Sequence, residues 1–175
     1  MRGVAARYPA YDRASASLFD VEARIEACRT RYQRATPIGA ESDEQLALAA
    51  FVWSRSRGML IAVTIDGPVR ASFERGRAYY EARRGQMDLA CADCHVRNVG
   101  KRLFAETISQ GHPTAFPAYR LEWQTLGSLA RRMRACLNGV RAELPPPNDP
   151  IYASLALYLA WRAQGLPIEA PGVRR

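Results

Sequence analysis

Three residues in one short stretch have the types and the spacing that attach haem to a protein. Cys91 and Cys94 are separated by two residues, and His95 follows the second cysteine directly. Thiols at this spacing add across the haem vinyl groups, and the adjacent histidine ligates the iron. A zinc site would need a second ligand pair, and the other cysteines and histidine are irregularly spaced. The motif predicts one covalently bound haem c with His95 as an axial ligand.

The iron needs a second axial ligand, and the chain offers three candidates downstream: His112, Met133 and Cys136. Methionine is the usual partner of histidine in electron-carrying cytochromes. Met133 and Cys136 lie three positions apart on one predicted helix, so both can face the same side. The residues themselves leave this choice open.

An arginine precedes one of these candidates by a helical turn. Arg132 lies four positions before Cys136 and shares its helix face. A guanidinium at this distance favours the thiolate form of the sulfur and can bind an oxyanion beside it. The alternative is that Cys136 is a small buried apolar residue and Arg132 a solvated one. As a functional pair they would support sulfur chemistry next to a haem.

Helical patterns dominate the elements that must position these residues. Apolar periodicity, capping residues and Gly stops predict helices over residues 20–33, 42–58, 68–84, 123–138 and 149–164. Residues 63–65 resemble a strand, but the segment is brief and isolated. The expected fold class is therefore all-α.

The chain also repeats itself at an offset of about 108 residues. Residues 25–28 resemble residues 133–136, and residues 57–61 resemble residues 164–168. The repeat predicts two tandem cytochrome c-like domains, over residues 1–65 and 66–175. The first has no haem motif, and its counterpart would fall before Met1. We therefore expect the first domain to be truncated at its N-terminus.

Charge and hydropathy exclude some classes of function. The 175 residues carry a net charge of +8, and 24 of the 25 basic residues are arginine. These arginines are spread along the chain, which disfavours a nucleic-acid partner and suits anionic ligands. No apolar run is long enough to span a membrane. Haem attachment of this kind predicts a periplasmic location, with the export signal absent from the given chain.

The motif set resembles the SoxA family, the catalytic cytochrome c subunits of the bacterial Sox thiosulfate-oxidising system. The resemblance covers nearly the whole chain. The matching stretches are residues 3–9, 84–86, 91–95, 100–103, 107–113, 117–124, 131–136 and 159–169.

The resemblance implies a role for each candidate residue. Cys91 and Cys94 would hold the active-site haem, with His95 as the proximal ligand. Cys136 would be the distal sulfur ligand, carrying a persulfide, and Arg132 would bind the anionic substrate. Cys28 would match either the distal ligand of a second haem or a disulfide partner of an upstream cysteine, and this chain contains neither counterpart.

The implied activity is that of an L-cysteine S-thiosulfotransferase. Thiosulfate would be joined oxidatively to a cysteine thiol of the carrier protein SoxYZ, with electrons passed through haem c to SoxX, a one-haem partner cytochrome. Two other hypotheses remain. One is a plain electron-transfer cytochrome with Met133 or His112 as distal ligand, and the other is a haem-based binding subunit whose catalysis lies elsewhere.

Overall fold

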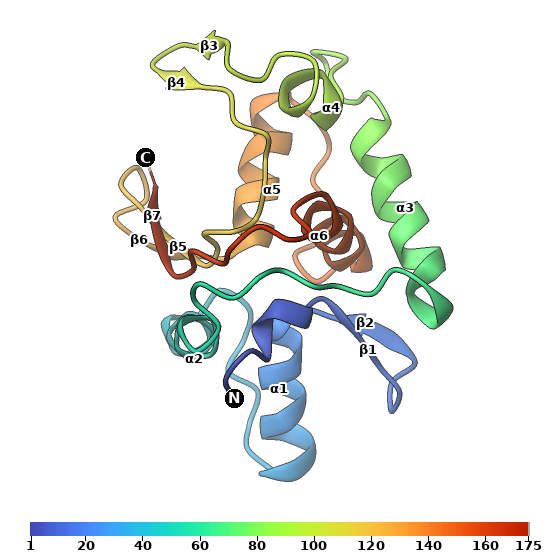
Figure 1. Cartoon of the computed structure of the whole chain (residues 1–175), viewed down its shortest axis with the longest axis vertical. Helices are drawn as coiled ribbons and strands as arrows, with labels where there is room; N and C mark the ends of the chain where they lie inside the picture. Colours follow the sequence, from blue (N-terminus) through green and yellow to red (C-terminus); the bar gives the residue numbers. More distant parts are fainter. Residues whose placement is uncertain (175) are drawn as a thin grey trace.

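The computed structural model describes residues 1–174, and helices form most of its regular structure (Figure 1). The six α-helices are α1 (Val21–Tyr32), α2 (Asp43–Ser54), α3 (Arg70–Glu81), α4 (Cys91–His95), α5 (Leu129–Gly139) and α6 (Pro150–Arg162). Two 3₁₀ turns lie at Ala5–Arg7 and Gly67–Val69. No helix within these residues is long and apolar enough to cross a membrane.

Polar side chains fix the beginnings of four helices. The carboxylates of Asp20 and Asp149 accept backbone N–H groups in the first turns of α1 and α6. The hydroxyls of Ser42 and Ser128 do the same for α2 and α5. Such caps satisfy N–H groups that have no partner inside the helix. The predicted helix beginning near Trp123 therefore begins later, after Ser128.

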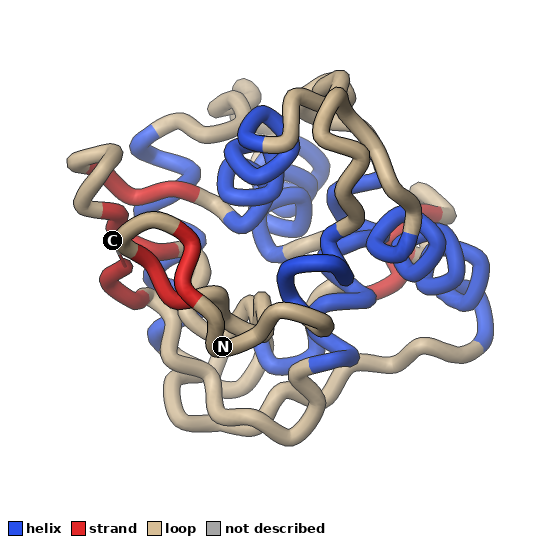
Figure 2. Tube along the Cα trace, turned by 90° about the horizontal axis from the view of Figure 1, so that it is seen from above, coloured by secondary structure: helices blue, strands red, loops and turns tan. Residues whose placement is uncertain are grey.

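The expectation of an all-α fold is wrong, because the connections contain short strands. The strands are β1 (Ala10–Asp12), β2 (Ser17–Phe19), β3 (Arg102–Leu103), β4 (Glu106–Thr107), β5 (Ala118–Arg120), β6 (Thr125–Gly127) and β7 (Gly172–Arg174). They form two hairpins, β1–β2 and β3–β4, and a three-stranded sheet of order β6-β5-β7. Figure 2 shows how little of the trace these strands occupy. Strands of two or three residues are too short to give an alternating pattern in the sequence, and residues 63–65 form none.

The core is built mainly where α3 and α6 cross. Gly76 on α3 permits the close approach, since a Cβ there would lie 2.1 Å from the carbonyl oxygen of Ser154 on α6. Around this point the rings of Phe73 and Tyr158 lie 5.7 Å apart, and those of Tyr80 and Tyr158 lie 5.1 Å apart. Aromatic pairs at these separations add to the stability that burial provides.

The structural elements repeat at the offset found in the sequence. A hairpin precedes a capped helix in both halves, as β1–β2 with α1 and as β5–β6 with α5. The two apolar tails that resemble each other also pair. Gly58 N–H donates to Ile168 O at 2.8 Å, and Ile61 N–H donates to Leu166 O at 3.0 Å.

The segment joining the two halves crosses the molecule between α1–α2 and α3–α6 (Figure 1). One cluster of buried side chains spans both halves, since Ala6, Ile61 and Val63 pack with the core of α3 and α6. A division into domains near residue 65 stays a prediction.

Candidate haem and sulfur site

The haem motif forms the short helix α4, which is held by one buried carboxylate. Asp93 is 6% exposed and accepts the backbone N–H of Ala90 at 2.9 Å. It also pairs with Arg97 and lies 3.5 Å from the guanidinium of Arg83. The Ala90 hydrogen bond and these two arginines hold the pKa of Asp93 below its usual range. Asp93 therefore keeps its charge and fixes the turn that presents both cysteines.

The imidazole of His95 is oriented by a backbone carbonyl. Its Nδ1 lies 2.8 Å from Ser109 O. A carbonyl can only accept, so Nδ1 carries the proton and Nε2 keeps its lone pair. Burial lowers the pKa of His95, as do Arg132 and Arg162, although the Ser109 carbonyl opposes them. A neutral histidine bound through one nitrogen to a carbonyl is the usual state of a metal ligand.

Gly111 lets this loop approach the ring. It adopts φ +71°, and a Cβ there would lie 2.9 Å from Cγ of His95. Arg162 on α6 ties the same region together, donating to His95 O at 3.2 Å and Gln110 O at 3.0 Å. Arg162 also donates to the hydroxyl of Tyr80. Ser109 and Arg162 are not among the site residues predicted from the sequence, because backbone acceptors and loop-to-helix contacts leave no local signal.

Helix α5 places Arg132 and Cys136 one turn apart, and both residues are half-buried. Burial raises the pKa of the Cys94 thiol, and the nearby Cys136 raises it further. Cys136 has the same effect on Cys91, and Arg132 acts on His95. Three sulfur atoms and one imidazole thus share one region, with a guanidinium beside them.

Arg84 supplies a second guanidinium next to the first haem-motif cysteine. Burial raises the pKa of the Cys91 thiol, whereas Arg84 lowers it. Arg84 stacks over the ring of Tyr79, with its central carbon 3.7 Å from the ring centroid. Its Nη1 is buried without a partner among residues 1–174.

This set of groups fits a c-type haem. Two thiols on one helix suit the thioether bonds, and the free Nε2 of His95 suits the iron. The sulfur of Cys136 is a donor of the type that ligates haem iron. Arg84 would offer its unpaired N–H to the anionic edge of such a group.

The alternative ligands lie in different surroundings. Met133 is 7% exposed, belongs to the main core cluster and lines a large cavity away from α4. His112 is half-buried, and burial lowers its pKa, with a further contribution from Arg162. Cys28 lies exposed on α1, and all four cysteines are free thiols in residues 1–174. The assignment of ligands and catalytic residues stays a prediction.

Comparison with known proteins gives one family. Residues 1–61 match the sequence model of the SoxA/TsdA cytochrome c domain. The L-cysteine S-thiosulfotransferase subunit SoxA of Rhodovulum sulfidophilum is 37% identical over 99% of this chain. A subunit of the same name from Hydrogenobacter thermophilus is 31% identical over the whole chain and is covered to 69% of its length. These similarities imply haem c as the cofactor.

A solved structure agrees with the sequence relatives. The crystal structure of SoxXA from P. pantotrophus matches with a TM-score of 0.94 and 33% identity, over 99% of this chain and 66% of that chain. The chain spans 61% of the length of the Rhodovulum sulfidophilum relative and 62% of the Pseudaminobacter salicylatoxidans relative.

Proposed function

Because the chain belongs to the SoxA family of L-cysteine S-thiosulfotransferase subunits, we propose that it couples thiosulfate oxidatively to a cysteine thiol of a SoxYZ-like carrier. One sulfur–sulfur bond forms, the carrier thiol gives up its proton, and two electrons leave the pair of reactants. A SoxX-like cytochrome, as in the SoxXA structure, is the proposed partner and electron acceptor. We place the reaction in the periplasm.

One haem c would be held by the residues of α4 and α5. Cys91 and Cys94 would hold it through thioether bonds, and His95 and Cys136 would bind its iron. When bound, the haem supplies a group that accepts electrons one at a time. The hydrogen bond from Nδ1 of His95 to Ser109 O holds the imidazole with Nε2 available.

The position of Arg132 one turn from Cys136 is the observation that carries the proposal. Thiosulfate is a dianion, and the thiol that it meets must lose a proton. Arg132 would neutralise part of this charge where the two sulfur atoms approach. Its guanidinium makes no hydrogen bond or ion pair with residues 1–174 and is therefore available to a ligand.

Cys136 would supply the sulfur that meets the substrate. A thiolate or persulfide can form a covalent intermediate, which divides one difficult step into two easier ones. We propose that Cys136 carries a persulfide. Intact mass after subtraction of haem should then show a gain of about one sulfur atom, which a reductant removes and which Cys136→Ala abolishes.

The test of the proposed function uses the haem-loaded protein, produced by secretion to the periplasm. Thiosulfate-dependent reduction of a cytochrome acceptor should require both a carrier thiol and Cys136. Cys136→Ala should alter the haem spectrum, whereas Met133→Leu should leave a low-spin spectrum with a sulfur-anion ligand. The electron-carrier alternative predicts the reverse, with Met133 needed for the spectrum and Cys136 dispensable.

A further inference from the structure

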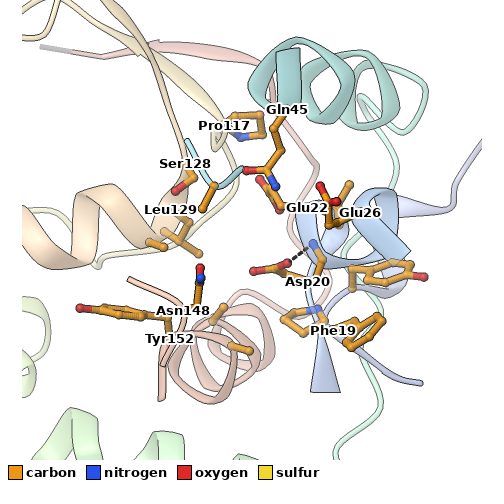
Figure 3. Close-up of a pocket in the computed structure, with 18 of the residues that line it drawn as sticks. Phe19, Asp20, Glu22, Glu26, Gln45, Pro117, Ser128, Leu129, Asn148 and Tyr152 are labelled. Carbon is orange, nitrogen blue, oxygen red and sulfur yellow. Dashed lines mark hydrogen bonds between the residues drawn. The ribbon is translucent and has the colours of Figure 1, made fainter. Parts of the chain in front are cut away.

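A cavity of about 780 Å³ lies between the first half of the chain and helices α5 and α6. Figure 3 shows that its wall comes from α1, α2, the beginning of α5 and the beginning of α6. None of Cys91, Cys94, His95, Arg132 and Cys136 lines it. It is therefore a different site from the haem and sulfur site.

Acidic residues outnumber basic residues on the wall of this cavity, although the protein as a whole is basic. The acidic residues that line it are Asp20, Glu22, Glu26, Glu41 and Asp149. None of them forms an ion pair with another residue of the described chain, although the protein carries a net charge of +8. Asp20 and Asp149 cap helices, whereas the carboxylate of Glu22 accepts no hydrogen bond from another described residue.

The arginines on the same wall are engaged elsewhere. Arg31 pairs with Asp12 at 2.8 Å. Arg131 lies over the ring of Trp123, 4.4 Å from its centroid. Arg134 donates to the carbonyl of Pro145 and to the hydroxyl of Tyr152. None of these three arginines therefore pairs with an acidic residue of the cavity wall.

Two polar atoms on the wall have no hydrogen-bond partner among residues 1–174, and one of them is buried. Gln45 is 7% exposed, and its amide oxygen accepts the N–H of Glu41 at 3.0 Å. Its amide nitrogen, which faces the cavity in Figure 3, donates to no atom of residues 1–174. Oε1 of Glu26 is buried and likewise unpaired. Buried polar atoms normally have partners, so the unpaired oxygen of Glu26 on a cavity wall indicates a ligand.

The chemistry of the wall defines the ligand. No three acidic, histidine or cysteine side chains among residues 1–174 converge closely enough to hold a metal ion. Apolar side chains of Phe19, Phe116 and Leu129 cover other parts of the wall. We propose that the cavity binds a small organic ammonium ion with an apolar body and a hydrogen-bond acceptor. The ammonium group pairs with Glu22, and the acceptor receives the amide N–H of Gln45.

The protonation of Glu22 makes the affinity of this cavity for a cation depend on pH. Burial raises the pKa of Glu22 to about 8, and the charges of Asp20 and Glu41 contribute. The other charged groups that line the cavity are Glu26 and Arg31 on α1, Arg131 and Arg134 on α5, and Asp149 at the start of α6. At pH 7 the carboxyl is mostly protonated, so binding of a cation releases a proton. Affinity therefore rises between pH 6 and pH 8.5.

The test is calorimetry on the haem-loaded protein with phenylalaninol, which has an ammonium, a hydroxyl and a phenyl group. We expect 3-phenylpropan-1-ol, which lacks the ammonium, to bind at least about tenfold more weakly. Glu22→Gln should weaken phenylalaninol binding about tenfold and abolish the proton release. Glu106→Gln makes the same replacement on an exposed hairpin and should change neither.

A second variant separates the two parts of the proposal. Gln45→Leu should remove the advantage of phenylalaninol over 2-phenylethylamine, which lacks the hydroxyl, and leave binding of 2-phenylethylamine unchanged. Equal binding of the ammonium and neutral probes to the parent protein would overturn the proposal. Equal effects of Glu22→Gln and Glu106→Gln would also overturn it.

Discussion

Helix α1 in the first half and helix α5 in the second half each carry an arginine one turn before a cysteine. Arg24 precedes Cys28, and Arg132 precedes Cys136 exactly 108 positions later in the sequence. The surroundings of the two arginines differ. Arg24 lies 2.9 Å from a carboxylate oxygen of Asp12 and donates to the hydroxyl of Tyr8 at 3.0 Å. Arg132 has no such partner within residues 1–174.

The hairpins that precede the two helices carry residues of opposite charge at one matching position, and this accounts for the difference. Asp12 ends β1, and Arg120 ends β5 at the matching position of the repeat. Asp12 binds both Arg24 and Arg31. Arg120 is a cation, so it cannot pair with Arg132, and it binds Glu122 at 2.7 Å instead. The same scaffold therefore uses its arginine for stability in one half and leaves it available for an anion in the other.

The largest expected effect is a difference in turnover between variants of the two cysteines. Cys136→Ala should lower thiosulfate turnover by about a thousandfold or more, because it removes the group that we propose as covalent catalyst. Cys28→Ala should leave turnover within about twofold and the haem spectrum unchanged. Steady-state reduction of the acceptor cytochrome and optical spectra measure both. Comparable losses in the two variants would contradict the division of roles between the halves.

The next effect separates the two arginines. Arg132→Met keeps an unbranched side chain but deletes its charge, and turnover should fall by about a hundredfold, as for loss of an electrostatic donor. Haem attachment should be unaffected. Arg24→Met should lower the melting temperature and leave turnover nearly unchanged, because Arg24 serves the ion pair with Asp12. Parent-like turnover of Arg132→Met would remove Arg132 from the mechanism.

The sequence predicted what short stretches encode. Residues 21–32, 70–81 and 150–162 form helices within the predicted ranges, because apolar periodicity and helix-ending residues are local properties. The helix predicted over residues 123–138 overlaps the hairpin of residues 118–127. Strands of three residues are too short to show an alternating apolar pattern. The candidate site followed from the haem motif and from the spacing of Arg132 and Cys136.

The sequence did not predict features made by contacts between distant segments. The carbonyl that orients His95 and the clamp formed by Arg162 depend on how the loop after α4 meets α6. The acidic cavity brings Glu22 together with Asp149, which are far apart in the chain. The sequence also did not predict that Arg132 has no ion-pair partner within residues 1–174, because this depends on the charge of Arg120 in a neighbouring hairpin.

Restoring the acidic residue in the second half sharpens the comparison. Arg120→Asp places a carboxylate where the first half has Asp12, and it should capture Arg132 as Asp12 captures Arg24. The KM for thiosulfate should rise about tenfold, with a smaller change in kcat, since Arg132 is withdrawn from the substrate rather than removed. The control is Arg120→Gln combined with Glu122→Gln, because it deletes the cation and leaves neither a new carboxylate nor a freed Glu122 beside Arg132. An equal rise in KM for both variants would show that capture is not the cause.

The smallest expected effect concerns acid stability of the first half. Hydrogen bonds from Ser15 and Arg31 hold the pKa of Asp12 well below its usual range. A carboxyl with a lowered folded-state pKa contributes stability that is complete above its unfolded pKa near 4 and is lost as the pH falls below it. Hydrogen exchange in residues 10–32 should therefore quicken between pH 5 and pH 3, relative to residues 118–139, after correction for the intrinsic rate. Asp12→Asn should exchange faster at pH 5 and lose most of this pH dependence, because its amide does not titrate. If the variant kept the pH dependence of the parent, the difference between the halves would not rest on Asp12.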